Sequence, residues 1–358
     1  MATATLPGTV EIDQITACID AFFTERLAAA SHLGVRYGQL WAAARDAAIG
    51  GKKHRPVLVL STYRELSASQ GESADASVVR VASALELLHT AFLLHDDVLD
   101  GDFMRRGHPN LAGLFATGAE GQGIDRERSA QWGQASAILA GDLLIHAAQR
   151  MIVDIEVPEA RRFDLLDLLS ESIFVTAAGE LADVAFSLHV EHADLGQVLE
   201  MCEMKTANYS FSTPLKAGAI LAGAAPETVR SLGEIGRLIG IAFQLRDDEL
   251  GVFGSPEVTG KSVMTDLRCG KMTPLIAYAR TTSQWNAISG LLGRAELTES
   301  DGVVLRGALE QCGARRFVED MIDDYVRSAI ERAESAHLPA ELQRQLTEIA
   351  RFAADRSA

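Results

Sequence analysis

Cysteine, proline and lysine are scarce in this 358-residue sequence; the nine prolines leave long segments that can form uninterrupted helices. The four cysteines lie far apart and form no CxxC pair, which argues against a disulfide framework or a zinc site and fits a reducing cytoplasm. No apolar run reaches the roughly 18 residues that span a bilayer, and the N-terminal residues lack the basic and apolar regions of a signal peptide. We therefore expect a cytoplasmic protein with no transmembrane segment.

Basic residues are also in the minority, with 33 against 49 acidic residues and a formal net charge of −16. A surface that binds nucleic acid or an anionic membrane needs a basic stripe, so neither is an expected partner. The hydrophobic share of 47% is enough for a large core, which excludes extensive disorder. The composition therefore predicts a folded, soluble protein.

Apolar residues recur at helical spacing along most of the chain, while alternating strand-like runs are nearly absent. Because no linker divides it, residues 1–358 are expected to form one all-helical domain. The predicted helices are 10–34, 54–70, 74–100, 130–153, 158–190, 194–206, 208–224, 226–250, 271–293, 300–312 and 315–336. Two Gly-containing segments, 101–129 and 251–270, break the pattern and are interpreted either as lids over a site or as plain surface loops.

The predicted helix 74–100 ends in the acidic sequence HDDVLD. Asp96 and Asp100 are one turn apart, so their carboxylates project from one face, with Asp97 beside them. These like charges repel one another at the negative end of the helix dipole. A divalent hard cation would offset that repulsion.

A second pair of carboxylates, Asp247 and Asp248, follows an apolar helix. Carboxylate oxygens without imidazole or thiolate suit Mg²⁺, which keeps several waters and is usually completed by substrate phosphates. One such cluster alone is more typical of a solvated helix end. Two of them, each followed by a loop with basic residues, favour a Mg²⁺ site for a phosphorylated substrate.

Only six lysines occur, and five lie in segments suited to phosphate binding. Lys52 and Lys53 precede a helix start, where backbone N–H groups and the helix dipole favour an anion. Lys205 lies mid-chain, and Lys261 and Lys271 follow the second acidic cluster. Two basic groups, one with the carboxylates and one without, would suit two diphosphates.

Six motifs, in their order along the chain, resemble those of the trans-isoprenyl diphosphate synthases, also called the polyprenyl synthetase family. They are GGKKHRP (50–56), ELLHTAFLLHDDVLDGDFMRRG (86–107), ILAGDLL (138–144), KTANYS (205–210), FQLRDDELG (243–251) and GKSVMTDLRCGKMT (260–273). The resemblance implies a bundle of about ten or more helices around a deep central cavity, with the two Asp-rich motifs at its mouth. It also implies a homodimer.

The resemblance implies a prenyltransferase that condenses isopentenyl diphosphate with dimethylallyl, geranyl or farnesyl diphosphate through ionisation, condensation and elimination. Mg²⁺, as three ions with substrate bound, would be held by Asp96, Asp97, Asp100, Asp247 and Asp248. The allylic diphosphate would be contacted by Arg105, Lys205 and Lys271, with Lys261 nearby. Isopentenyl diphosphate would be bound by Lys52, Arg55, His89 and Arg106. Thr206 and Gln244 would lie near the carbocation.

Three positions depart from the usual motifs of the family. Gly251 stands where many members have the last aspartate of the second motif, which implies a weaker or water-mediated hold on the metal. Glu180 stands where glutamine is usual, and His54 where an apolar residue is more common. None of the three removes a residue that the chemistry requires.

Product length is interpreted from the turn before the first acidic motif. In this family an aromatic side chain five residues before the first aspartate tends to stop growth early, and here that position is Ala91. With Phe92 as the residue that limits further growth, we expect the prenyl chain to grow past fifteen carbons and give geranylgeranyl diphosphate. A farnesyl or longer polyprenyl product is the alternative, and both residues could also simply pack the helix.

Three rival interpretations remain open. A class I terpene cyclase of related fold would share the carboxylates and Mg²⁺ but would not need the isopentenyl site. A ferritin-like di-iron bundle uses two Glu-x-x-His motifs, matched here by Glu86-x-x-His89 and Glu334-x-x-His337, although His337 precedes Leu-Pro at a predicted helix end. A non-catalytic regulatory subunit commonly lacks part of the motif set that is intact here.

Overall fold

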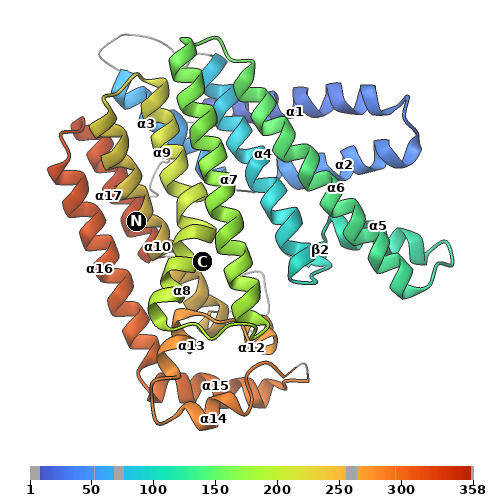
Figure 1. Ribbon diagram of the computed structural model, residues 1–358, viewed down its shortest axis with the longest axis vertical. Coiled ribbons are helices and arrows are strands. Elements are labelled where there is room, and N and C mark those ends of the chain that lie inside the picture. The colour runs from blue at the N-terminus through green and yellow to red at the C-terminus, as the bar shows by residue number, and fades with distance from the viewer. Residues whose placement is uncertain are drawn as a thin grey trace. The chain divides into compact units, whose positions relative to one another are not determined.

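A computed structural model describes residues 9–51, 53–67, 76–105, 107–254, 264–294 and 296–355 (Figure 1). Helices make up nearly all of the regular structure in these residues, and the two strands have two residues each. The predicted all-α fold class is therefore confirmed. The chain divides into two compact units, one of Met1–Ser170 with Pro214–Ala225 and one of Glu171–Thr213 with Pro226–Ala358. The single domain over 1–358 and the deep central cavity remain predictions.

The first unit is built around one central helix, α4. Its helices and strands are α1 (Thr9–Ala30), α2 (Val35–Ile49), α3 (His54–Ser67), α4 (Ala76–Leu99), β1 (Met104–Arg105), β2 (His108–Pro109), α5 (Leu111–Glu120), α6 (Arg126–Val153), the start of α7 (Glu159–Ser187) and most of α9 (Thr213–Leu221). α4 packs against α1, α3 and α6. Leu85, Leu88 and Ala91 are buried on it at three-residue spacing, so packing fixes the helix that carries the first acidic motif.

Two helices of this unit, α4 and α6, are long and apolar enough to cross a membrane by length and composition alone. In α4, 72% of the most apolar window is buried inside the protein, and in α6 the share is 50%. The two helices also pack against each other. Such burial is typical of core helices in a globular fold.

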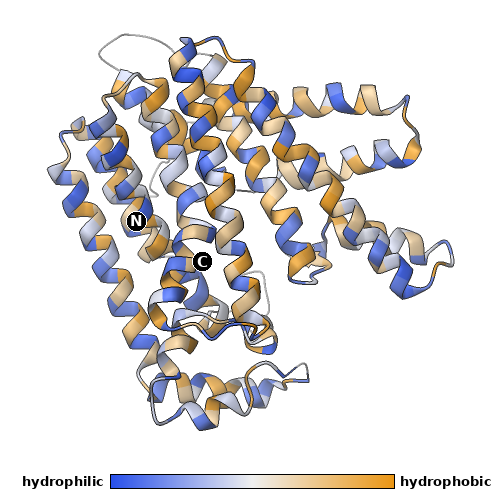
Figure 2. Ribbon diagram, viewed as in Figure 1, coloured by the Kyte–Doolittle hydropathy of each residue, from blue (hydrophilic) through white to orange (hydrophobic). Residues whose placement is uncertain are grey.

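The second unit is centred on α10 (Pro226–Phe253). Its other helices are the end of α7, α8 (Leu195–Cys202), the π-helix η2 (Glu203–Ser212), α12 (Thr265–Cys269), α13 (Pro274–Ala279), α14 (Trp285–Ser289), α15 (Glu299–Gln311), α16 (Ala314–Ser335) and α17 (Ala340–Ala354). α10 packs against η2, α16 and α17. Figure 2 shows polar and apolar residues mixed along α16 and α17, as expected of helices with one buried face.

The interpretation of residues 101–129 as one loop was wrong. The strands β1 and β2 pair in antiparallel register, and α5 follows directly. The side chain of Asn110 accepts a hydrogen bond from the backbone N–H of Gly113 at 2.8 Å, which caps the start of α5. Leu111 and Phe115 then bury one face of this short helix. The glycines of this segment suggested a loop. The Asn110 cap and the apolar face nevertheless stabilise a helix there.

Other helix boundaries also differ from the prediction. The helices α2, α5, α12 and α17 were not predicted, and the single helix expected at 271–293 is two short ones, α13 and α14. The helices expected at 194–206 and 208–224 form one nearly continuous run of α8, η2 and α9. The segment 255–263 lies outside the described residues.

Candidate active site

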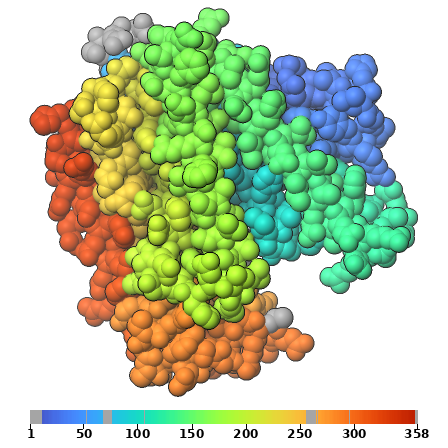
Figure 3. All heavy atoms as spheres, viewed as in Figure 1, coloured from blue at the N-terminus to red at the C-terminus, as the bar shows by residue number. Residues whose placement is uncertain are grey.

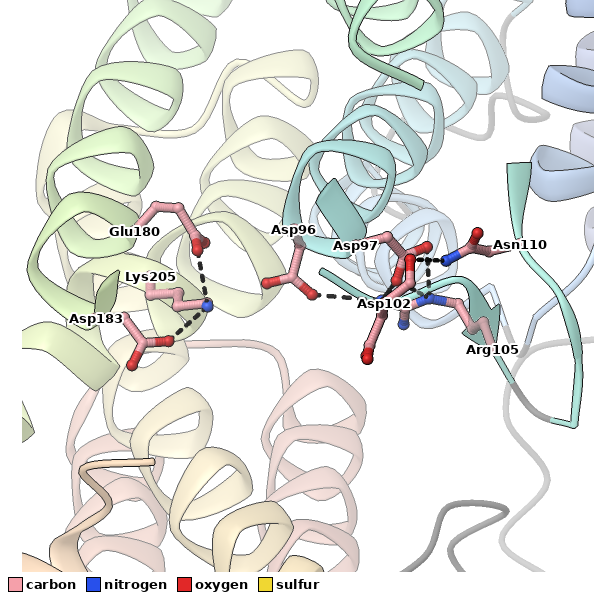
Figure 4. Close-up of polar contacts among 8 residues, drawn as sticks. All are labelled: Asp96, Asp97, Asp102, Arg105, Asn110, Glu180, Asp183 and Lys205. Atoms are coloured by element: carbon pink, nitrogen blue, oxygen red, sulfur yellow. Dashed lines mark hydrogen bonds and ion pairs between the residues drawn. The ribbon is translucent and has the colours of Figure 1, made fainter. Parts of the chain in front are cut away.

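The first acidic motif lies at the end of α4, where the chain turns back on itself. The backbone N–H of Asp102 donates to the carbonyl of Asp97 at 2.8 Å, and Gly101 has the positive φ that this turn requires. The strand β1 then brings Arg105 back to the motif (Figure 4). Its Nη2 lies 2.6 Å from Oδ1 of Asp97 and 3.3 Å from Oδ2 of Asp96. The hairpin therefore assembles two aspartates and one arginine from one short stretch of chain.

The negative charge of the Asp97 carboxylate is costly because the residue is buried, with 3% exposure. Burial raises the pKa of its carboxyl, Arg105 opposes that rise, and the neighbouring charges of Asp96 and Asp102 add to it. Asp100 is exposed, and its backbone N–H donates to the carbonyl of Asp96. One guanidinium does not fully compensate these carboxylates, so a further cation would be favoured here.

Lys53 does not serve as a phosphate ligand in the way that its position in the sequence suggested. Its ammonium is buried, donates to the carbonyls of Gly50 (2.9 Å) and Ala48, and lies 3.2 Å from the Glu86 carboxylate on α4. Its backbone adopts φ 52°, a left-handed conformation that few non-glycine residues take. Lys53 therefore anchors the loop before α3, and Arg55 follows in the first turn of that helix.

In the second unit, Lys205 lies between two carboxylates of α7. Its Nζ is 3.0 Å from Oε1 of Glu180 and 2.7 Å from Oδ2 of Asp183, and Figure 4 shows both contacts. Glu180 and Asp183 are three residues apart, so they share one face of α7. Lys205 and Thr206 both belong to η2. π-Helices are rare and occur frequently at functional sites.

Two glycines allow neighbouring helices to approach η2 closely. A Cβ atom at Gly179 of α7 would lie 2.3 Å from the backbone nitrogen of Lys205. A Cβ atom at Gly240 of α10 would lie 2.5 Å from Cα of Ala207. Both distances are too short for real side chains. The backbone of η2 is therefore held between α7 and α10 by direct contact.

The second acidic motif ends α10 and holds Lys271. Oδ1 of Asp248 accepts from the amide of Gln244 at 2.9 Å and from Nζ of Lys271 at 3.3 Å. Burial raises the pKa of Asp248 to about 6, Lys271 opposes the rise, and the charges of Asp266 and Asp247 add to it. Asp247 itself is exposed. Lys271 is thus placed beside a carboxylate of the second acidic motif.

The buried thiol of Cys202 lies among these charged groups. Burial and the charge of Asp248 raise its pKa, and the charges of Lys271 and Lys205 act in the opposite direction. The charges of Lys205, Lys271 and Asp248 all affect the pKa of this one thiol, so these three groups lie near one another in the second unit.

The structure thus brings seven of the predicted residues into two local clusters. The first holds Asp96, Asp97 and Arg105, and the second holds Lys205, Gln244, Asp248 and Lys271. Three predicted residues, Lys52, Arg106 and Lys261, lie outside the described residues. His89, Ala91 and Phe92 lie on α4, ahead of the first acidic motif.

Sequence reasoning missed several charged residues around these clusters. The buried Glu249 carboxylate accepts hydrogen bonds from Arg246 on the same helix and from Arg315 of α16. Nε of Arg315 lies 3.1 Å from Oε1 of Glu249. Glu86 was considered only as part of a di-iron motif. An acidic residue at an apolar position of a helix pattern, as at both places, is the signal that could have revealed them.

The chemistry of the donor atoms fits a hard divalent cation. Both motifs offer carboxylate oxygens, and burial makes their negative charges costly without a cation. Within the part of the chain that the structure describes, no group of three His, Cys, Asp or Glu side chains is placed to hold a metal ion by itself. A bound metal would therefore need further oxygen ligands from substrate or water.

Comparison with known proteins identifies the group to which these features belong. Residues 39–304 match the family model of polyprenyl synthetase. The chain belongs to the polyprenyl synthetase family. Polyprenyl synthetase relatives include the geranylfarnesyl diphosphate synthase of Aeropyrum pernix, which is 34% identical over 78% of this chain and 82% of the relative. The geranylgeranyl diphosphate synthase of Methanosarcina mazei is 33% identical over 79% of each chain.

Solved polyprenyl synthetase structures share the fold. The geranylgeranyl pyrophosphate synthase of Corynebacterium glutamicum, complexed with isoprenyl diphosphate and magnesium, has a TM-score of 0.87 and 27% identity, covering 96% of this chain and 99% of its own. A polyprenyl synthase from Caulobacter crescentus, complexed with calcium and isoprenyl diphosphate, has a TM-score of 0.73 and 28% identity, covering 99% of this chain and all of its own. The predicted family and enzyme class, a prenyl-transferring diphosphate synthase, are confirmed.

Proposed function

We propose that this protein condenses isopentenyl diphosphate with allylic diphosphates in a Mg²⁺-dependent reaction and makes geranylgeranyl diphosphate. One observation carries the proposal: each acidic helix end holds a basic side chain against a buried carboxylate, Arg105 on Asp97 and Lys271 on Asp248. Such a pairing suits a metal-bound diphosphate. Its negative charge needs cationic partners, and it can take the place of the carboxylate beside Arg105 or Lys271. We further propose that the enzyme acts in the cytoplasm as a homodimer.

Mg²⁺ would be held by the carboxylates of both motifs, with three ions bound when substrate is present. The proposed ligands are Asp96, Asp97, Asp100, Asp247 and Asp248. When bound, Mg²⁺ supplies Lewis acidity that stabilises the negative charge of the departing diphosphate. Support comes from the all-oxygen donor set and from the C. glutamicum structure, which contains magnesium.

The basic residues would stabilise the same leaving group. The allylic C–O bond breaks and its electron pair leaves with the diphosphate, whose charge Arg105, Lys205 and Lys271 offset, with Lys261 nearby. The isopentenyl double bond then forms the new C–C bond with the allylic carbon. A proton is lost to the released diphosphate, which restores a double bond in the product.

The remaining proposed residues orient the second substrate and the cation. Isopentenyl diphosphate would be bound by Lys52, Arg55, His89 and Arg106. Gln244 donates its amide N–H to Asp248, which leaves its carbonyl oxygen for the electron-poor carbon, and Thr206 would lie close by. Water would capture the carbocation, so the site must close around both substrates.

Product analysis tests this function. The purified protein is incubated with Mg²⁺, isopentenyl diphosphate and dimethylallyl, geranyl or farnesyl diphosphate in turn, and the products are identified by mass spectrometry. We expect diphosphates extended to about twenty carbons, with turnover lost in Asp97→Asn and Asp248→Asn. Release of a hydrocarbon would support a terpene cyclase instead, and absence of any turnover would support a non-catalytic subunit.

Chain length is tested at the turn before the first motif. Ala91 is fully buried on α4, and a phenyl ring there would shorten the space for the growing chain. We expect Ala91→Phe to shift the product towards farnesyl diphosphate and Phe92→Ala to lengthen it. Thermal unfolding of both variants separates this effect from overpacking. An unchanged product spectrum in a folded Ala91→Phe variant would reject Ala91 as a determinant.

A further inference from the structure

The hairpin that carries Arg105 is too small to keep a fixed shape by itself. Its strands, β1 and β2, have two residues each and pair at two positions. An isolated two-stranded hairpin is marginally stable at best in water. Contacts from outside the two strands must therefore fix the direction in which Arg105 points towards the first acidic motif.

Asn110, which directly follows β2, makes such a contact with both ends of its side-chain amide. Its Nδ2 donates to the backbone carbonyl of Asp102 at 2.8 Å, as Figure 4 shows, and its Oδ1 accepts from the backbone N–H of Gly113 at 2.8 Å. Because one partner needs a donor and the other an acceptor, both bonds form only when the amide nitrogen faces Asp102. Asn110 is buried, with 9% exposure. One side chain thus joins the turn before β1 to the first turn of α5.

The backbone of α5 also lies directly against this turn. The N–H of Asn110 donates to the carbonyl of Phe103 at 3.1 Å, and a Cβ atom at Gly113 would lie 2.1 Å from that carbonyl oxygen. α5 is in turn fixed on α6, since a Cβ atom at Gly133 would lie 2.2 Å from the carbonyl oxygen of Ala112. α6 packs against α4, which carries the first acidic motif. These close-packed helices form a rigid support for the hairpin.

The turn that Asn110 holds is the one that leads from the acidic motif to Arg105. On the side of the motif, the N–H of Asp102 donates to the carbonyl of Asp97 at 2.8 Å. Three residues further along the chain, Nη2 of Arg105 lies 2.6 Å from Oδ1 of Asp97. A shift of the Asp102 carbonyl would therefore move Arg105 relative to the acidic motif.

We propose that Asn110 is a positioning residue for diphosphate binding, because its amide holds the turn at Asp102 and thereby keeps Arg105 against the first acidic motif. The inference rests on the proposed function, in which Arg105 contacts the allylic diphosphate. The two ends of the amide then have separate effects. The donor to Asp102 governs the position of Arg105, and the acceptor from Gly113 stabilises the start of α5.

Binding of an allylic diphosphate without condensation tests the proposal. The dissociation constant of geranyl diphosphate is measured by calorimetry with Mg²⁺ and without isopentenyl diphosphate, and thermal unfolding is followed in parallel. Serine caps a helix as well as asparagine does, but its shorter side chain cannot span both partners. We expect Asn110→Ser to raise the dissociation constant about fivefold and to leave the unfolding temperature unchanged. Asn110→Ala removes both ends of the amide, so it should raise the constant equally and also lower the unfolding temperature.

A double-variant cycle with Arg105 separates positioning from a general structural effect. If Asn110 acts through the guanidinium, Asn110→Ser should change the dissociation constant less than about twofold in the Arg105→Gln background. Asp125→Ala is the control, because it removes the exposed cap of α6; it should lower the unfolding temperature without changing binding.

An unchanged dissociation constant in folded Asn110→Ser, or an equal rise with and without Arg105, would overturn the role of Asn110. If the parent protein does not bind geranyl diphosphate with Mg²⁺ at all, the proposed function itself fails, and the role of Asn110 fails with it.

Discussion

The buried carboxyl of Asp248 links protonation to the stability of the fold. Burial raises its pKa from the ordinary 3.8 to about 6 even though Lys271 lies beside it. Between these values the folded state binds the proton more tightly than the unfolded chain. The contribution of protonated Asp248 to the free energy of unfolding is therefore complete below about pH 4 and is lost as the pH rises through about 6. The raised pKa of Asp97 acts in the same direction.

We expect Asp248→Asn to remove this pH dependence. In the absence of Mg²⁺, the free energy of unfolding of the parent protein should fall relative to that of the variant by about 3 kcal/mol between pH 4 and pH 7, which corresponds to a difference of about two pKa units. Denaturant unfolding in EDTA at several pH values measures the difference. Parallel pH profiles of the two proteins would contradict it.

Glu180 is expected to compete with substrate for Lys205. A diphosphate that binds the Lys205 ammonium must weaken its contacts with Glu180 and Asp183, which lie 3.0 and 2.7 Å away. Glu180→Gln removes one of these charges, so we expect the KM for the allylic diphosphate to fall about fivefold, as about 1 kcal/mol implies. The KM for isopentenyl diphosphate should not change. Steady-state kinetics with each substrate varied in turn checks this, and a raised allylic KM would show that Glu180 assists binding.

The residues of the acidic motifs could be predicted from sequence because charge and helical spacing are local properties. The partners of Lys53 and Lys205 could not, because Glu86 and Glu180 come from helices distant in the chain. The closeness of the Asp266 carboxylate to Gly251 depends on how α12 packs against α10, which no local pattern records. Charged residues at apolar helix positions would have been the best sequence guide.

At the scale of elements, the π-helix η2 depends on close contact with α10. A Cβ atom at Gly240 would lie 2.5 Å from Cα of Ala207, and backbone cannot move as a flexible side chain can. We expect Gly240→Ala to destabilise the fold by about 1–3 kcal/mol and to raise the KM for the allylic diphosphate by moving Lys205. Denaturant unfolding and steady-state kinetics test the two effects.

Gly307 provides the matched control for this substitution. It lies within α15, and a Cβ atom there would meet nothing within 4 Å. Gly307→Ala should therefore be neutral or stabilise the protein by up to about 1 kcal/mol, because alanine is the better helix former. Equal effects of the two substitutions would contradict the packing argument.

Hydrophobic periodicity predicted the longest helices but missed α2 and α17, which have 15 residues each, and several shorter ones. It identified α4 and α10, whose apolar faces run over many turns. It failed at α5, where a capping asparagine and a few apolar residues stabilise a ten-residue helix rich in small residues. It could not distinguish η2 from an α-helix, because the width of a helical turn is decided by tertiary contacts.

At the scale of the whole molecule, the predicted homodimer has a candidate surface on α6. Ile138 and Leu139 are 43% and 55% exposed, and Figure 3 shows atoms of α6 at the surface of the face seen there. Apolar side chains grouped on one helix are typical of an interface between subunits. Half of the apolar window of α6 remains unburied within the chain.

We expect Leu139→Glu to shift a homodimer towards monomers, because a charge buried in the interface would lack a partner. Light scattering coupled to size-exclusion chromatography measures the mass. Val303→Glu, at a position 63% exposed on α15, is the control and should leave the mass unchanged. A dimer that persists in Leu139→Glu would place the interface elsewhere.

The continuity of α4 has a consequence for the dimensions of the proposed reaction space. His89, Ala91 and Asp96 all belong to this one unbroken helix. Since an α-helix rises 1.5 Å per residue, His89 and Asp96 lie about 10 Å apart along its axis. That spacing is set by covalent geometry and backbone hydrogen bonds, so substitutions can alter what borders the space, whereas only insertion or deletion of residues between 89 and 96 would change the spacing itself.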